Sequence, residues 1–141
     1  MQATNFIIGC IVLILTFLPK SSLANSIGDI AVSKGNSVIE REDKKEVKVN
    51  KGLDVFSYDT VKTGKGEVAI KFVDDTRVDV TSHSKLIIDE FIYDPNAKTG
   101  KLSLKAAIGT VRYASGQIAK NSAQNISIKT PTATVSVRGT D

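Results

Sequence analysis

The single histidine, His83, lies in the polar segment TSHSK, between two serines and a few residues after an aspartate. Ser82 or Ser84, together with His83 and Asp79, supply the residue types of a Ser-His-Asp triad. Neighbours in sequence rarely adopt the spatial geometry that a triad requires, and nothing nearby indicates an oxyanion hole. We therefore interpret His83 as a solvated residue of a turn between strands.

Two groups of closely spaced acids are candidates for calcium binding. They are Asp74, Asp75 and Asp79 in the first group, and Asp89, Glu90 and Asp94 in the second. Calcium requires carboxylate and carbonyl oxygens that converge in one loop, and neither spacing matches such a loop. Because alternation places Asp79 on the outer face of its strand, we interpret the acids as a hairpin tip and a solvated face.

The composition gives little support for glycoside hydrolysis, phosphate binding by a glycine-rich loop or nucleic-acid binding. A glycosidase needs two acids facing a cleft and aromatic residues that stack on sugars, but the chain has no Trp and few aromatic residues. The segment GKGEVAIKF lacks the length and the following helix of a phosphate-binding loop. The basic residues are spread singly along the chain, which argues against nucleic-acid binding. We predict no catalytic residue, no cofactor and no metal site.

The amino-terminal region has the pattern of a secretory signal. Residues 6–18 carry no charge, and these thirteen residues are fewer than the roughly 20 that a membrane-spanning helix needs. Ser22 and Ala24 supply small residues at the two positions that a signal peptidase reads. We predict a signal helix within residues 1–24 and cleavage after Ala24. The segment before the apolar run has no Lys or Arg, so an uncleaved signal anchor is the alternative.

Cleavage would change the chemistry of the remaining chain, residues 25–141. It would remove the only cysteine, Cys10, and so exclude disulfides and thiolate sites. It would leave 18 basic and 15 acidic residues, a net charge of +3 in place of +4. We predict a single domain, in the periplasm or secreted, with no stable membrane anchor.

Apolar and polar residues alternate through most of this chain, as strands with one buried and one solvated face require. The clearest examples are EVAIKFV (67–73), RVDVT (77–81), KLSLKA (101–106) and NISIKT (125–130). No segment keeps a helical apolar stripe over three turns. We therefore predict an all-β fold, an antiparallel β-sandwich or roll of short strands that follows the signal helix, with a small barrel-like lead-in over residues 27–64.

Three segments carry more specific predictions. LIIDEFIYD (86–94) has adjacent apolar residues, which favours a bulge that reverses the facing of a strand or a crossing between sheets. VDDT (73–76) is a candidate two-residue hairpin in which Asp75 stands where glycine would cost less. SGQIAKNSAQ (115–124) could include a helical turn.

Five segments together resemble a known family. They are DTVKTG (59–64), FVDDT (72–76), SHSKLIIDEFIYDP (82–95), IGTVRYASGQIAK (108–120) and TPTATVSVRGTD (130–141). They are similar to the FecR domain of bacterial envelope proteins in its stand-alone secreted form, and the last segment is the most specific. Asp75 departs from the family pattern, which usually has glycine there.

The resemblance implies an all-β envelope domain without catalytic residues, which binds an envelope protein or polymer and has a role in sensing or signalling. Regulatory members pass a signal through a transmembrane helix to a cytoplasmic segment, and this sequence has neither. In the family another strand follows the Gly-Thr-Asp corner, so we expect the sequence to be truncated. The alternatives are a structural or adhesive fragment of a longer surface protein and an envelope hydrolase.

Overall fold

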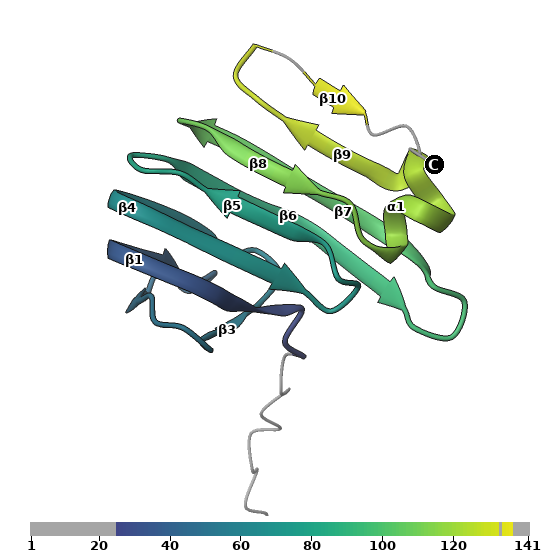
Figure 1. Cartoon of the computed structure of the whole chain (residues 1–141), viewed down its shortest axis with the longest axis horizontal. Coiled ribbons are helices and arrows are strands. Elements are labelled where there is room, and N and C mark those ends of the chain that lie inside the picture. The colour runs from purple at the N-terminus through teal and green to yellow at the C-terminus, as the bar shows by residue number, and fades with distance from the viewer. Residues whose placement is uncertain (1–24, 133, 137–141) are drawn as a thin grey trace, which may run out of the picture.

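The structure is a computed structural model that describes residues 25–132 and 134–136, and these residues are mostly in β-strands (Figure 1). This confirms the predicted all-β fold. One short helix, α1 (Gln117–Ser122), and a single 3-10 turn (Ala123–Asn125) follow the eighth strand. The strands are β1 (Gly28–Glu40), β2 (Glu46–Lys48), β3 (Asp54–Val55), β4 (Thr60–Phe72), β5 (Arg77–Val80), β6 (Lys85–Asp94), β7 (Thr99–Ile108), β8 (Val111–Ala114), β9 (Ile126–Lys129) and β10 (Thr134–Ser136).

The strands form one hydrogen-bonded sheet that branches at β4. Residues 60–62 of β4 pair with β6, whereas residues 68–71 pair with β5. One arm therefore continues from β6 through β7 and β9 to β10, and the other from β5 to β8, while β1 pairs with the opposite side of β4 (Figure 1). Every pair is antiparallel except β7 with β9, which is parallel. The observed form of the predicted sandwich or roll is thus an open, branched sheet.

The two arms of the sheet share one hydrophobic core. Val78 of β5 and Leu104 of β7 are both fully buried and belong to the same cluster. The rings of Phe72 in β4 and Phe91 in β6 stack within it, with their centroids 5.2 Å apart. β1 adds Ile39 to the same cluster. Burial of apolar surface therefore stabilises the packing of the two arms against each other.

The prediction for residues 86–94 is confirmed by a bulge in β6. The pairing with β7 runs from Ile88 opposite Leu104 directly to Glu90 opposite Ser103, so Asp89 is the extra residue. Buried positions are even-numbered up to Ile88, and the next buried residue is Phe91. The bulge thus reverses which face of the strand is buried, so that Ile88 before it and Phe91 after it both belong to the core.

The β4–β5 connection differs from the predicted two-residue hairpin. The Phe72 backbone N–H donates a hydrogen bond to the Thr76 carbonyl at 2.8 Å, so Val73, Asp74 and Asp75 form a three-residue loop. Asp75 has a φ of +69°, in the left-handed region, which confirms that glycine would cost less there.

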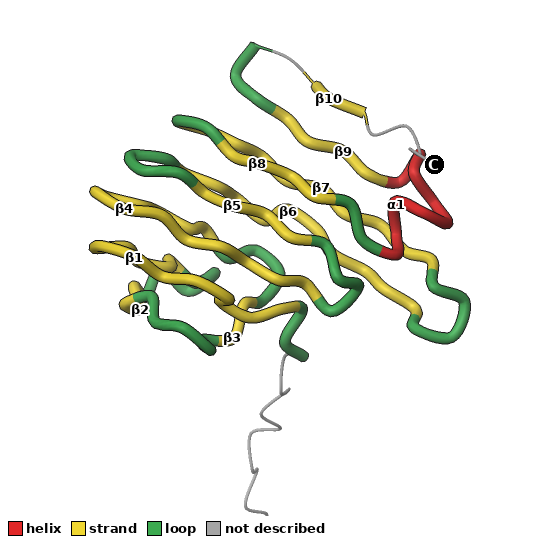
Figure 2. Tube along the Cα trace, viewed as in Figure 1, coloured by secondary structure: helices red, strands yellow, loops and turns green. Residues whose placement is uncertain are grey.

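The helical turn predicted within residues 115–124 is confirmed as α1, which packs at one end of β7 and β9 (Figure 2). Ile118 and Ala119 of this helix are buried against the core. Residues 1–24 lie outside the described residues, and so do the last five, so the signal helix, its cleavage and the terminal corner stay predictions. No helix within the described residues is long and apolar enough to cross a membrane.

Candidate binding surface

The residues of the hypothetical triad do not assemble. His83 is exposed in the β5–β6 turn, at a φ of +52°. Ser84 is buried, and its Oγ accepts a hydrogen bond from the Thr110 backbone N–H at 3.1 Å, which ties the turn to the β7–β8 connection. Among the described residues, no hydrogen bond joins the imidazole to Ser82, Ser84 or Asp79. Ser84 therefore has a structural role, and His83 is placed as the sequence predicts.

The two groups of acids do not converge either. Asp79 lies half-buried on the outer side of β5, as predicted, and accepts a hydrogen bond from the Arg77 Nε at 2.9 Å. Glu90 on β6 pairs with Lys101 of β7 at 3.1 Å. In the part of the chain that the structure describes, no three His, Cys, Asp or Glu side chains gather in a way that could hold a metal ion.

Asp74 has a structural role that the sequence analysis missed. Its side chain is 1% exposed, and Oδ2 accepts hydrogen bonds from the Thr76 hydroxyl at 2.7 Å and the Ile118 backbone N–H at 3.1 Å. Oδ1 accepts a third hydrogen bond from the Thr76 N–H at 3.1 Å. A short Asp-to-Thr spacing is typical of an Asx turn and was the only available signal. The bond to the first turn of α1 could not be predicted from it.

A buried ion pair closes the β3–β4 loop. Arg41 donates a hydrogen bond to Asp59, whose side chain is 1% exposed, and its guanidinium lies over the Phe56 ring at 4.9 Å. Burial raises the pKa of the Asp59 carboxyl, while the Phe56 N–H and the Arg41 charge act in the opposite direction. These groups line a hollow of about 400 Å³. Because they satisfy one another, they leave few free groups for a ligand.

Glycines mark the point at which β4 changes partners. Between the residues that pair with β6 and those that pair with β5, β4 contains Gly64 and Gly66. The β5–β6 turn packs at this point, where the His83 N–H donates to the Gly64 carbonyl at 2.9 Å and the Thr63 N–H donates to the Ser84 carbonyl at 2.9 Å. We call this part of β4, with Gly35 opposite it on β1, the glycine corner. The sheet branches at this corner.

Two glycines of the corner face each other with no room for a side chain. Gly35 and Gly66 are paired and have φ values of +79° and +123°. A Cβ on Gly35 would lie 1.8 Å from the Lys65 carbonyl oxygen, and one on Gly66 would lie 1.9 Å from the Lys34 carbonyl oxygen. The close approach places the neighbouring residues Lys34 and Lys65 at the same corner.

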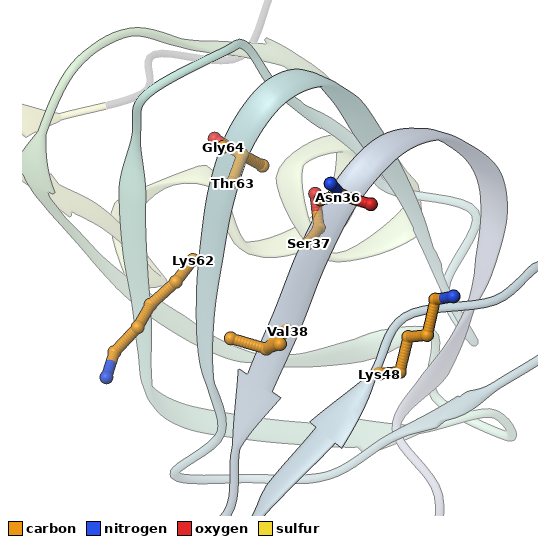
Figure 3. Close-up of a pocket in the computed structure, with 7 residues that line it drawn as sticks. All are labelled: Asn36, Ser37, Val38, Lys48, Lys62, Thr63 and Gly64. Carbon is orange, nitrogen blue, oxygen red and sulfur yellow. The ribbon is translucent and has the colours of Figure 1, made fainter.

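A shallow groove of about 440 Å³ lies where the β1–β4 pairing skips from Gly35 to Ser37. Figure 3 shows Lys48 and Lys62 on either side of Val38 along it. The Lys62 ammonium is held by Glu40 at 2.5 Å and Glu46 at 3.6 Å. The full lining is Asn36, Ser37, Val38, Lys48, Lys62, Thr63 and Gly64.

A second hollow, of about 370 Å³, lies beside the glycine corner and is rich in cations. We call it the basic pocket, and its lining is Lys34, Lys65, Gly66, Glu67, Thr81, Ser82 and Arg112. Lys34 pairs with Glu67 at 3.3 Å. Lys65 and Arg112 are exposed and form no ion pair with another described residue. The pocket thus combines segments from β1, β4, β8 and the β5–β6 turn, which are far apart in the sequence.

The fold is thus a β domain with several solvent-facing hollows. The model of the family described as FecR protein matches residues 59–141, more than half of the chain, and the chain therefore belongs to the FecR family. This confirms the resemblance that the sequence motifs indicated. A solved structure titled "Cell surface anchoring domain" is also similar, with 32% sequence identity, coverage of 43% of this chain and 82% of that chain, and a TM-score of 0.42. None of the curated proteins compared with the chain matches it.

Proposed function

We propose that this chain is an exported, non-enzymatic FecR-family domain that binds a protein or polymer of the cell envelope and takes part in sensing or signalling there. Membership of the FecR family is the observation that carries this proposal. The basic pocket at the glycine corner supports it, because its cationic side chains and Ser82 are exposed to solvent.

The arrangement of the titratable residues supports a non-enzymatic role. General acid–base or nucleophilic catalysis needs a base within hydrogen-bond reach of its nucleophile. His83 is exposed and forms no such bond with Ser82 or Ser84 among the described residues. The hydrolase alternative is tested by incubating the protein with envelope glycans and ester substrates. Turnover that disappears in His83→Ala would contradict a binding role.

Export is tested on the amino terminus of the protein in the producing cells. We expect mass spectrometry of the exported fraction to find a chain that begins at Asn25, because the small residues before it suit signal peptidase. A chain that keeps residues 1–24 in the membrane fraction would support the uncleaved anchor instead. In that case the binding domain would remain tethered to the membrane.

Binding is tested with envelope material from the same cells, divided into a protease-treated polymer fraction and a polymer-free protein fraction. We expect saturable binding of the exported protein to one of the two fractions and not to the other. The heat-denatured protein is the control for adhesion through exposed apolar surface. An absence of saturable binding to both fractions would contradict the proposed function.

A further inference from the structure

We infer that the basic pocket binds a phosphate-bearing polymer of the cell envelope. The inference rests on the proposed function, since it names the partner class for a surface of the same domain. Its basis is the unbalanced charge of the pocket. Three cationic side chains line it, those of Lys34, Lys65 and Arg112, against the single carboxylate of Glu67.

The charge of the pocket is available to a ligand. Glu67 neutralises Lys34, from which its carboxylate is 3.3 Å away. Lys65 and Arg112 have no comparable partner among the described residues, and both side chains are exposed. The hydroxyl of Ser82 lines the same pocket, is exposed, and forms no hydrogen bond to another described residue. Two positive charges and a free hydroxyl donor therefore face one hollow.

These donors fit phosphate better than a carboxylate. They come from different elements, since Lys65 lies on β4, Ser82 in the β5–β6 turn and Arg112 on β8. An acceptor placed between them must present oxygens in several directions. A phosphate within a chain holds two non-bridging oxygens in tetrahedral geometry, and the next phosphate supplies two more. Two of these oxygens can bind the Arg guanidinium while others accept from the ammonium and the hydroxyl.

The backbone fixes the positions of these residues relative to one another before any ligand arrives. The facing glycines, Gly35 and Gly66, bring β1 and β4 into close approach beside Lys65. The backbone of Arg112 on β8 lies opposite that of Asp79 in the β5–β8 strand pairing, and Thr81 is tied to the β7–β8 connection by hydrogen bonds to the Thr110 carbonyl. A preorganised site loses less conformational entropy on binding than a flexible one.

A polymer suits the pocket better than a single phosphate ion. The pocket is open to solvent, where salt screens each charge–charge contact and leaves it weak. A chain with repeated phosphates rebinds at high effective concentration after each dissociation, which strengthens the overall interaction. The occupant that the pocket fits is therefore an extended polyanion.

The test uses the exported protein and long-chain polyphosphate as the probe, with binding measured by calorimetry at low and at physiological salt. We expect Lys65→Gln combined with Arg112→Gln to weaken binding by about tenfold or more, because both unpaired charges are lost. Lys51→Gln combined with Lys129→Gln removes the same charge from exposed positions outside the pocket. This control should change the affinity by less than about twofold.

A third variant is expected to act in the opposite direction. Glu67→Gln removes the only carboxylate of the pocket and frees Lys34, so it should tighten polyphosphate binding by several-fold while the melting temperature stays nearly unchanged. The unchanged melting temperature excludes misfolding as the cause of a gain in affinity. Equal losses in the pocket variant and the control variant would overturn the inference, because general electrostatic attraction would then explain the binding.

Three further probes distinguish which class of negatively charged ligand the pocket binds. Inorganic phosphate and poly-glutamate should bind at least about tenfold more weakly than polyphosphate. Stronger binding to phosphatidylcholine vesicles that contain phosphatidylglycerol would assign the pocket to a lipid surface and overturn the polymer assignment. If the pocket variant still binds an envelope fraction as the unaltered protein does, this inference fails and the proposed function stands. If neither the pocket variant nor the unaltered protein binds any envelope fraction, this inference and the proposed function both fail.

Discussion

The Asp74 carboxylate in the β4–β5 turn accepts a hydrogen bond from the Ile118 backbone N–H at 3.1 Å, although the two residues are 44 positions apart. Asp74 also uses its backbone carbonyl, which accepts from the Gln117 N–H at 2.7 Å. Gly116 allows this contact, because a Cβ there would lie 2.3 Å from the Thr76 nitrogen. The β4–β5 turn thus anchors α1, the helix that packs against β7 and β9.

Removal of this anchor should destabilise the domain. Asp74→Ala would leave three buried donors without acceptors, namely the N–H and hydroxyl of Thr76 and the N–H of Ile118. A buried donor that loses its partner costs about 1–3 kcal/mol, so we expect the free energy of unfolding to fall by about 2–4 kcal/mol. Urea denaturation followed by circular dichroism measures this change. A loss below about 0.5 kcal/mol would show that water replaces the carboxylate.

The adjacent residue should respond in the opposite way. Asp75 is exposed at a φ of +69°, and its only ion pair is a 3.8 Å contact with Lys71, within the described residues. Asp75→Gly relieves the left-handed backbone strain and loses an exposed ion pair of little value. We expect the free energy of unfolding to rise by up to about 1 kcal/mol. A decrease in the urea midpoint would contradict this explanation.

The glycine corner should tolerate no side chain. Gly35→Ala and Gly66→Ala each place a Cβ within 2 Å of a backbone carbonyl oxygen, and β1 and β4 would have to separate. We expect each variant to lose more than about 2 kcal/mol of stability, through strain and lost pairing. Gly52→Ala is the matched control, because Gly52 also has a positive φ, of +87°, but has no atom within 4 Å of the added Cβ.

Comparing the two corner variants with Gly52→Ala separates the cost of the steric clash from the cost of the left-handed backbone conformation. Gly52→Ala should cost only the left-handed strain, about 1 kcal/mol. Thermal denaturation of the three variants side by side measures the difference. Similar losses in all three would mean that the φ angle alone, and not the close approach of the strands, makes glycine necessary at the corner.

The ion pair between Glu40 and Lys62 should contribute to the pH dependence of stability. The hydrogen bond from Lys62, at 2.5 Å, holds the pKa of the Glu40 carboxyl below its ordinary value of 4.5. A carboxyl with a lowered folded pKa stabilises the folded state above its unfolded pKa and loses that contribution as the pH falls through the folded pKa. We therefore expect Glu40→Gln to lower the urea midpoint at neutral pH and to have less effect below pH 4.5.

The Lys62 member of the same pair should make the stability of the folded state fall at high pH. The hydrogen bond to Glu40 raises the pKa of Lys62 above 10.5, so its contribution is present below that value and is lost as the pH rises further. Glu42→Gln is the control, since Glu42 is exposed and has no ion pair among the described residues. A pH profile of Glu40→Gln that runs parallel to that of the unaltered protein would rule out this role.

Local sequence signals predicted the buried faces of several strands, although β1 and β4, at 13 residues each, are longer than the short strands expected. Alternation around Val68, Ile70 and Phe72 predicted that these three share a buried face of β4. All three are buried, although Ala69 on the other face is buried as well. The run of apolar residues about Ile88 predicted the β6 bulge, because two adjacent apolar side chains cannot both face the core of a regular strand. The family motifs from residue 59 onward were likewise visible in the sequence.

The functions of individual polar residues were not predictable in this way. Asp74 and Asp79 lie in the same acidic group, yet one is buried beneath a helix and the other lies on the outer face of β5. Sequence spacing could not distinguish them, since the helix that covers Asp74 follows some forty residues later. His83 and Ser84 are neighbours, but the β7–β8 connection buries only the serine.

The sequence by itself determined that this chain is a β protein of the FecR family, because strand periodicity and motif spacing are local properties of the chain. Only the tertiary structure decided that β4 changes partners at Gly64 and Gly66 and that Lys65 and Arg112 line one hollow. These relationships depend on which distant strands pair. That choice is made by burial of a shared core, a non-directional force that no short segment encodes alone.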